Sequence, residues 1–150
     1  MKKNKIKDTG LEVTELSFGT SSLGSMPDTY GYEVPELRAQ ETLKRFFQGP
    51  ANMLDTSRNY AMGESEKRIG KAIKENGGWP NGFLLSTKLD RNMDTLVLDK
   101  NRVRESLEES LKTLNVDSVD ILFLHDPEYA KDITDITKKN GAMDELFKIK

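Results

Sequence analysis

Four side chains with complementary chemistry are spread through the middle of the sequence: Asp55, Tyr60, Lys88 and His125. Together they could deliver a proton to a carbonyl oxygen, but none can supply a hydride, so the reaction would need a bound organic cofactor. Tyr60 would be the acid, because a nearby ammonium such as that of Lys88 favours the phenolate. Asp55 would hold the ammonium in an ion pair, and a neutral His125 could hydrogen-bond the carbonyl and orient it.

Each of these residues alone also has an ordinary structural interpretation. Asp55 could cap a turn after a strand, because aspartate readily hydrogen-bonds nearby backbone amides. Tyr60 could be a packing residue, Lys88 a solvated strand end and His125 a polar turn residue. Their joint placement favours the catalytic interpretation. The chain has no cysteine and one histidine, so thiolate chemistry is excluded and no metal site is predicted.

Short apolar strands alternating with amphipathic helices must carry these residues. Strand patterns cover residues 16–20, 52–55, 83–88 and 119–124. Helix patterns begin at Pro35, with Leu37 among the apolar positions, and cover residues 64–74 and 99–114. This alternation indicates a parallel sheet covered by helices, an α/β class. The four residues fall at or just after the C-terminal ends of three successive strands, which is the functional face of a parallel barrel.

The ends of the chain refine the fold prediction. Residues 5–7 and 12–14 flank a turn at residues 8–10, which predicts an N-terminal β-hairpin. Residues 142–150 begin an amphipathic helix without a cap or a following strand. A (β/α)8 TIM barrel needs about 250 residues, so about four βα units make a half barrel.

We therefore expect residues 1–150 to be the truncated N-terminal half of a single barrel domain, with no second domain. A doubly wound sheet is the alternative. It is disfavoured because the first strand-to-helix turn lacks the G-x-G-x-x-G sequence that a Rossmann site would place there.

Charge and hydropathy exclude two kinds of partner. The balance of 23 basic against 25 acidic side chains argues against a nucleic-acid or membrane surface. No run approaches the roughly 18 to 20 apolar residues needed to cross a bilayer, and no apolar segment follows the first four residues as a signal peptide would. We expect a cytoplasmic protein.

Four short sequences carry a resemblance to a known family. They are Leu-Asp-Thr-Ser-Arg-Asn-Tyr at residues 54–60, Gly-Glu-Ser-Glu at 63–66, Ser-Thr-Lys at 86–88 and Leu-His at 124–125. In this order they resemble the aldo/keto reductases, and the likeness covers essentially the whole chain. It implies an NAD(P)-linked carbonyl reductase or alcohol dehydrogenase on a (β/α)8 barrel, with a catalytic tetrad at Asp55, Tyr60, Lys88 and His125.

The resemblance also implies a cofactor site. Gly19 and Thr20 would lie where the first loop approaches the cofactor, and Asp55 and Tyr60 would face the nicotinamide ribose and ring. The cofactor would be NADP or NAD, with NADP slightly preferred. The later strands that hold most of the nucleotide in this family lie beyond residue 150, so we do not expect tight binding by this chain alone.

The substrate is expected to be a small aldehyde, ketone or sugar. Barrel sites are built from the loops after the strands, so Tyr30 and Tyr32 could contact it together with His125. Arg91 and Asn92, just beyond the third strand, could likewise contact a polar substrate. The sequences at residues 18–20 and 124–127 look most similar to the branch of aldose 1-dehydrogenases, L-fucose dehydrogenases and pyridoxal dehydrogenases. Within residues 63–66, Ser65 or Glu64 is expected to cap the following helix rather than touch substrate.

Two other interpretations remain open. The chain could be a catalytically idle half-barrel that acts as an interaction or regulatory protein, because the family resembled includes regulatory subunits of potassium channels and a half-barrel must cover its open edges. Alternatively, two copies could complete one barrel as a homodimer across a self-complementary interface.

Overall fold

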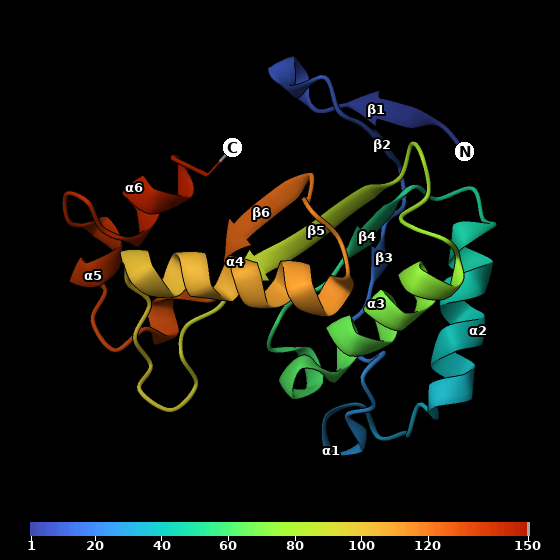
Figure 1. Cartoon of the computed structure of the whole chain (residues 1–150), viewed down its shortest axis with the longest axis horizontal. Helices are drawn as coiled ribbons and strands as arrows, with labels where there is room; N and C mark the ends of the chain where they lie inside the picture. The colour runs from blue at the N-terminus through green and yellow to red at the C-terminus, as the bar shows by residue number, and fades with distance from the viewer. Residues whose placement is uncertain (150) are drawn as a thin grey trace.

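A four-stranded parallel sheet forms the centre of the molecule, as seen in a computed structural model that describes residues 1–149 (Figure 1). The strands are β3 (Phe18–Gly19), β4 (Met53–Asp55), β5 (Leu84–Leu89) and β6 (Ile121–Leu124). They lie in the order β3-β4-β5-β6, so that each strand pairs with its neighbour along the chain. A doubly wound sheet reverses its strand order at a switch point, whereas this order runs in one direction, as in a barrel wall.

Three helices link the strands: α2 (Glu36–Phe47), α3 (Glu64–Glu75) and α4 (Lys100–Leu114). They cover one face of the sheet, because alternate strand residues point toward them. Leu54 and Leu85 are buried against Leu43 of α2 and Ile69 of α3. A second cluster contains Leu89 of β5 and Val103 of α4, together with Leu98, Ile136 and Ala142. These two clusters form the hydrophobic core.

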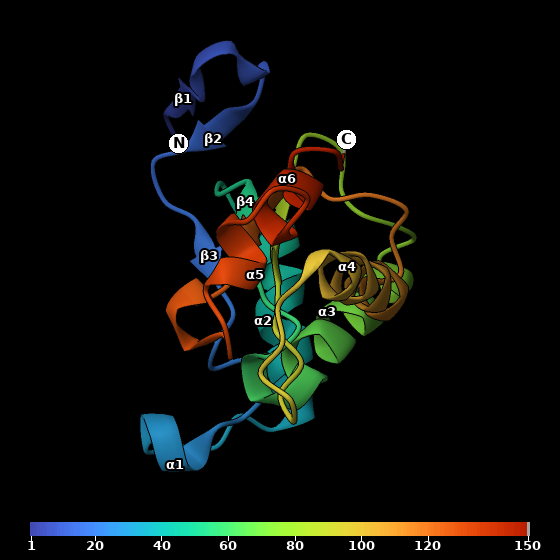
Figure 2. The ribbon, with the colours of Figure 1, turned by 90° about the vertical axis from the view of Figure 1, so that its left-hand side faces the viewer.

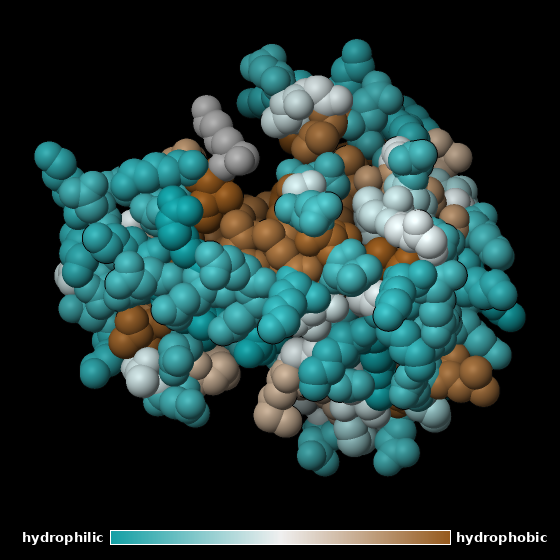
Figure 3. All heavy atoms as spheres, in the orientation of Figure 1, coloured by the Kyte–Doolittle hydropathy of each residue, from teal (hydrophilic) through white to brown (hydrophobic). Residues whose placement is uncertain are grey.

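The other face of the sheet is not covered by helices α2 to α4. Asp55, Ser86 and Lys88 alternate with the buried leucines and therefore point to this face. Phe123 of β6 pairs with Lys88 and is 49% exposed. In the space-filling view an apolar hollow opens between the N-terminal hairpin and the C-terminal helices, over β5 and β6 (Figure 3). The chain therefore presents the inner wall of a partial barrel.

An antiparallel hairpin of β1 (Lys3–Lys5) and β2 (Glu12–Thr14) stands beyond the amino end of the sheet (Figure 2). Asn52 fastens it: its Oδ1 accepts from the Thr14 backbone N at 2.9 Å, and its Nδ2 donates to Glu12 O at 2.9 Å. The predicted hairpin is confirmed, but its first strand lies two residues earlier than expected. Residues 7–9 form a short 3-10 turn, η1 (Lys7–Thr9), instead.

The predicted strands and helices are confirmed with shifted boundaries. The strand expected at residues 16–20 is reduced to two residues, and Leu16 is 65% exposed. Asp99 is the N-cap of α4, where its carboxylate accepts from the backbone N of Asn101 and Arg102. Leu37 was expected on the apolar side of its helix, but it is 72% exposed because the buried stripe runs through Ala39, Leu43 and Phe46.

Several short elements were not predicted: α1 (Pro27–Tyr30), η2 (Tyr60–Gly63), η3 (Pro127–Tyr129) and α5 (Thr134–Thr137). The helix expected at residues 142–150 is only α6 (Ala142–Leu146), and residue 150 lies outside the described residues. This helix packs against α4, where Arg104 forms an ion pair with Glu145. Within residues 1–149, no helix is both long enough and apolar enough to cross a membrane.

Candidate active site

Lys88 lies at the centre of the group of residues singled out from the sequence. Its Nζ donates to Oδ2 of Asp55 at 2.7 Å and to the carbonyl oxygen of Thr56 at 2.8 Å. The same nitrogen lies 4.7 Å from the centroid of the Tyr60 ring. The Lys88 side chain is only 14% exposed, so solvent screens this ion pair less than it screens a surface pair.

Strand register explains why Asp55 and Lys88 meet although 33 residues separate them. Asp55 pairs with Gly19 on one side and with Ser86 on the other. The hydroxyl of Ser86 donates to Oδ1 of Asp55 at 3.0 Å. Lys88 lies two residues beyond Ser86 and so faces the same side of the sheet, within reach of the carboxylate.

A strained turn places Tyr60. Tyr60 begins η2, and the two residues after it, Ala61 and Met62, have φ values of 51° and 52°. Left-handed backbone costs roughly 1 to 2 kcal/mol for each such residue. The turn lets the Tyr60 ring approach the ends of β5 and β6, where it lies edge-on to the His125 ring, with centroids 5.7 Å apart and an interplanar angle of 81°.

His125 follows β6 directly, and its backbone N extends the ladder by donating to Leu89 O at 3.0 Å. In the side chain, Nδ1 of His125 lies 2.5 Å from Oδ1 of Asp90 and 3.1 Å from Oγ of Ser57. Asp90 is fully buried, and its Oδ2 accepts from Ser57 Oγ at 2.8 Å. The fold thus brings all four predicted residues together and adds two partners of His125.

The sequence prediction missed Asp90 and Ser57. A signal for both was present, because Asp90 follows its strand directly, as His125 does, and Ser57 lies within the sequence motif at residues 54–60. Their significance depends on the pairing of β5 with β6, which places residues 90 and 125 at the same sheet edge.

A buried carboxyl group lies behind β5. Glu66 of α3 is fully buried, and its Oε1 accepts from the Thr87 hydroxyl at 2.7 Å. Its Oε2 has no hydrogen-bond partner within residues 1–149. Burial raises the pKa of Glu66 above its ordinary value. Glu66 belongs to the helix layer, because Thr87 points away from the face that carries Lys88.

Two arginines share a carboxylate beside this layer. Arg102 donates from Nε to the backbone carbonyl of Asp90 at 2.9 Å and from its NH2 nitrogen to Glu109 Oε2 at 2.8 Å. Arg58 Nε donates to the same Glu109 oxygen at 2.8 Å. The hydrogen bond from Arg102 is the main reason that the pKa of Glu109 lies below its ordinary value. This network ties the turn after β4 to α4 and the end of β5.

Gly19 and Thr20 lie at the end of β3 and differ in accessibility. Gly19 is exposed, and a Cβ there would meet no atom within 4 Å. Thr20 is buried, and its hydroxyl donates to the carbonyl oxygen of Asp55 at 2.9 Å. The carbonyl of Thr20 in turn accepts from the Ser65 hydroxyl at 2.6 Å.

The expectation that Ser65 or Glu64 caps α3 is wrong. The N-cap is Gly63, in the left-handed conformation at φ 90°, and no side chain caps the helix. Ser65 instead joins α3 to the end of β3 through Thr20, and Glu64 pairs with Arg68 at 3.2 Å. Ser65 therefore joins two elements, whereas the pair of Glu64 with Arg68 lies within α3.

The residues proposed as a substrate wall lie in two loops. Tyr30 and Tyr32 are 39% and 49% exposed, with ring centroids 6.3 Å apart, and Tyr30 Oη donates to Ser21 Oγ at 2.8 Å. Arg91 lies over the ring of Tyr129 at 5.5 Å. Within residues 1–149, neither tyrosine hydrogen-bonds or stacks with any of the four central residues.

Asn92 shapes its own loop. Its Oδ1 accepts from the backbone N of Asp94 at 3.0 Å and of Thr95 at 2.9 Å. An asparagine that satisfies two amides of its own turn has less capacity for a ligand. In the loop after β5, Asn92 is therefore engaged within its own turn, whereas Arg91 stacks on Tyr129.

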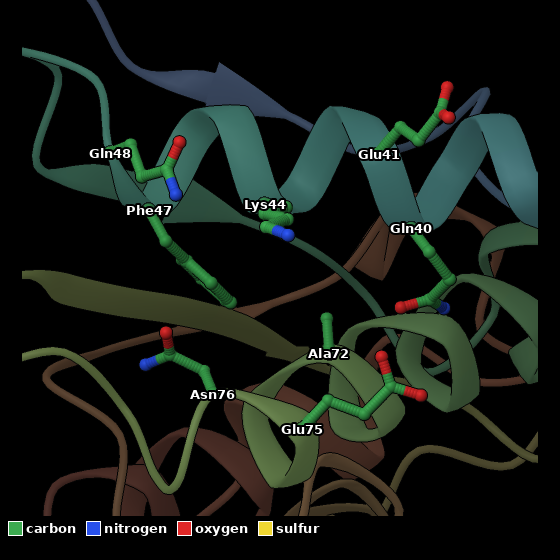
Figure 4. A pocket seen from close by; sticks show the side chains of 8 residues that line it. All are labelled: Gln40, Glu41, Lys44, Phe47, Gln48, Ala72, Glu75 and Asn76. Atoms are coloured by element: carbon green, nitrogen blue, oxygen red, sulfur yellow. The ribbon is translucent and has the colours of Figure 1, made fainter.

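A groove between α2 and α3 holds a cavity of about 300 Å³ (Figure 4). Its walls are Gln40, Glu41, Lys44, Phe47, Gln48, Ala72, Glu75 and Asn76. It contains none of the four central residues and lies in the helix layer. This cavity is therefore separate from the place where Asp55, Tyr60, Lys88 and His125 meet.

This arrangement can bind and polarise an oxygen-containing substrate. A phenol, an ammonium and an imidazole lie around one point, and a carboxylate fixes the ammonium. Among the described residues, no group of three or more histidine, cysteine, aspartate or glutamate side chains could hold a metal ion.

Comparison with known proteins gives one family. The model of the aldo/keto reductase family matches residues 15–149. L-galactose dehydrogenase of Arabidopsis thaliana is 38% identical over 122 residues, covering 81% of this chain and 37% of the relative. A probable voltage-gated potassium channel subunit beta of the same plant is 28% identical over 141 residues, covering 92% of this chain and 41% of the relative.

Solved structures share the fold. The holo form of aldo-keto reductase AKR11C1 from Bacillus halodurans superposes with a TM-score of 0.66 at 26% identity, covering 95% of this chain and 48% of that one. The chain thus spans about two fifths of the length of the two curated relatives, 37% and 41%.

Proposed function

Because the chain belongs to the aldo/keto reductase family, we propose that Asp55, Tyr60, Lys88 and His125 form the active site of an oxidoreductase. This enzyme would interconvert carbonyl and alcohol groups of small aldehydes, ketones or sugars with a nicotinamide cofactor. One observation carries the proposal: the ammonium of Lys88 is bound to the Asp55 carboxylate and lies against the Tyr60 ring at the same time.

In the direction of reduction, Tyr60 donates its phenolic proton to the substrate oxygen. Lys88 stabilises the phenolate that forms, because a nearby positive charge favours this negatively charged form of the side chain. Asp55 keeps the ammonium in place, and Ser86 fixes the second carboxylate oxygen. A reduced nicotinamide would supply the hydride to the carbonyl carbon. Oxidation of the alcohol is the reverse, with the phenolate taking the hydroxyl proton.

The residues present fit the nicotinamide end of such a cofactor. Gly19 leaves its surroundings open, since a Cβ would meet nothing there within 4 Å. Asp55 lies beside it in register and is 27% exposed, so its carboxylate can accept a hydrogen bond from a ribose hydroxyl. Thr20 would act by holding the carbonyl of Asp55, and Tyr60 would face the ring. We propose NADP in preference to NAD.

The similarity to an L-galactose dehydrogenase supports a sugar or hydroxyaldehyde as the substrate class. The substrate would lie against His125, with Tyr30, Tyr32 and Arg91 forming its outer wall. Arg91 can bind a polar substrate with its guanidinium, because within residues 1–149 this group stacks on Tyr129 and its Nε has no hydrogen-bond partner. We assign the chain to the aldose dehydrogenase branch on this basis, as the N-terminal half of one barrel domain.

The test is a titration of the purified chain with NADPH and NADH, followed by nicotinamide fluorescence, with molar mass measured on the same sample. Saturable binding by the wild type, even at millimolar cofactor, that is weakened in Asp55→Ala and unchanged in Asp28→Ala supports the proposal. Asp28 is exposed in α1 and serves as the matched control. A folded chain that binds neither nucleotide would contradict a cofactor site in this chain alone.

A second candidate is an interaction or regulatory protein without turnover. The exposed Phe123 on the inner face, together with the relative described as a probable potassium channel subunit, favours this candidate. A second copy of the chain could cover that face by pairing edge strands. A dimer that binds no nucleotide would support this alternative, whereas a monomer that reduces an aldehyde with NADPH would exclude it.

A further inference from the structure

We propose that Asp90 is a positioning residue that holds the proton of neutral His125 on Nδ1, so that Nε2 meets the substrate as a hydrogen-bond acceptor. This inference rests on the proposed function, because it specifies how the imidazole works within that site. It concerns a second carboxylate, distinct from the Asp55 that pairs with Lys88.

The contact between the two side chains is direct. His125 Nδ1 lies 2.5 Å from Asp90 Oδ1, and the Asp90 side chain is fully buried while that of His125 is 16% exposed. A carboxylate only accepts hydrogen bonds, so the ring nitrogen that faces it must carry the proton. Placing the proton on Nε2 would leave the Nδ1 lone pair against a buried carboxylate at this distance.

Asp90 is itself held in place by two segments of the chain, the turn after β4 and α4. Its Oδ2 accepts from Ser57 Oγ at 2.8 Å and from the backbone N of Asn59 at 3.2 Å. Its backbone N donates to Ser106 Oγ at 2.9 Å, and its carbonyl accepts from Arg102. The two bonds to Oδ2 come from the turn after β4, so the carboxylate cannot rotate away from the imidazole without breaking them, while the two bonds from α4 hold the backbone of Asp90 in place.

The opposite nitrogen remains available. Within the described residues, Nε2 of His125 makes no hydrogen bond, and the nearest carboxylate oxygen, Oδ2 of Asp126, is 3.9 Å away. Asp126 is half exposed and cannot impose a tautomer from that distance. The Tyr60 ring packs edge-on against the imidazole, so Nε2 is the polar atom that His125 offers to a ligand.

This assignment changes the expected role of His125. A neutral ring protonated on Nδ1 cannot donate from Nε2 to a carbonyl oxygen, because both atoms are acceptors. The neutral form instead accepts from a substrate hydroxyl, and the proton for the carbonyl oxygen comes from Tyr60. A hydroxyl beside the reacting carbon, as in hydroxyaldehydes and sugars, provides such a donor.

The experiment uses the fact that the chain contains a single histidine. The protein is labelled with ¹⁵N-histidine, and long-range ¹H–¹⁵N correlation spectra are recorded at rising pH until the ring signals stop changing. The pattern of cross-peaks in the neutral ring identifies which nitrogen carries the proton. We expect the Nδ1–H form to exceed the Nε2–H form by at least about tenfold, because hydrogen bonds to charged groups are among the strong ones.

Two variants separate a specific role from a general effect on the fold. Asp90→Ala removes the carboxylate and should lower the ratio of Nδ1–H to Nε2–H by at least about tenfold. Asp126→Asn is the matched control, since it changes the other nearby carboxylate and should leave the ratio unchanged. Backbone amide spectra of each variant report whether it is folded.

A wild-type ring with its proton mainly on Nε2 would overturn the proposal, whatever the variants do. An Asp90→Ala protein that folds and keeps the wild-type ratio would overturn it as well. Neither result depends on nucleotide binding or turnover. Failure of this proposal is therefore distinguishable from failure of the proposed function, which the nucleotide titration tests separately.

Discussion

The Nζ atom of Lys88 lies 2.7 Å from Oδ2 of Asp55, and the two residues belong to adjacent parallel strands. The pair lies on the face of the sheet that the helices leave open, so it is available to a ligand. The Lys88 ammonium also lies 4.7 Å from the centroid of the Tyr60 ring, a cation–π contact that a structural and a catalytic lysine can both make.

Lys88→Met should reduce carbonyl turnover by about 10² to 10⁴-fold, because the phenolate of Tyr60 would lose its nearby positive charge. The measurement is NADPH oxidation with a small aldehyde, in a preparation in which the wild type turns over. Lys67→Met is the control, since Lys67 is 67% exposed on α3 and should not affect turnover. Equal rates for Lys88→Met and the wild type would count against the pairing of Lys88 with Tyr60.

Tyr60→Phe should reduce turnover by a similar factor of about 10² to 10⁴ while changing the free energy of unfolding by less than about 0.5 kcal/mol. Within residues 1–149 the hydroxyl of Tyr60 makes no hydrogen bond, so its removal breaks no contact of the fold. Urea unfolding and turnover are measured on the same samples. Tyr129→Phe is the matched control, because it removes a hydroxyl from an exposed tyrosine and keeps the ring on which Arg91 stacks. An active Tyr60→Phe enzyme would refute the acid role.

Glu66→Gln should stabilise the chain more as the pH rises. The pKa of Glu66 is raised by burial above 4.5, so the wild type pays no ionisation penalty below that pH and loses stability as the pH rises toward the folded-state pKa. The difference between variant and wild type should grow by up to about 1.4 kcal/mol per pH unit in that window. Urea unfolding at several pH values between about 4 and 8 measures it. A pH-independent difference would mean that folding does not raise the pKa of Glu66.

Glu109→Gln should show the opposite dependence. Arg102 lowers the pKa of Glu109, so the charged carboxylate stabilises the fold above 4.5 and this contribution disappears as the pH falls through the folded-state pKa. The variant should lose about 1 kcal/mol near neutral pH, a value reduced for solvent screening because the Glu109 side chain is 40% exposed. The loss should shrink in acid. A loss that stays constant between about pH 7 and pH 3 would contradict the ion-pair explanation.

Gly70→Ala should destabilise the chain by at least about 2 kcal/mol, because α3 and α4 approach each other closely there. A Cβ at Gly70 would lie 2.1 Å from the carbonyl oxygen of Thr113, which is backbone and cannot move aside alone. Gly19→Ala is the control for stability, since its Cβ would meet nothing within 4 Å and the change should cost less than about 0.5 kcal/mol. Similar urea midpoints for both variants would show that the helices can separate easily.

The sequence by itself determined the order of strands and helices and the places where polar side chains follow strands. Period-two and helical patterns report local burial, so Leu54, Leu85 and Ile69 could be assigned to a core without knowing their partners. The motif around Asp55 and Tyr60, with Lys88 and His125, was sufficient to indicate the family. The outward position of Leu37 was missed because its own helix offers several apolar faces and only tertiary packing selects one.

Only the tertiary structure decided which polar groups meet. Strand register sets whether Lys88 reaches Asp55 or its neighbour, and a shift of one residue would turn either side chain to the helix layer. The pairing of Asp90 with His125 depends on two loops that follow adjacent strands, and the positive φ values after Tyr60 depend on the surrounding contacts. These contacts join residues that are far apart in the sequence. The propensities and hydrophobic pattern of each segment therefore cannot specify them.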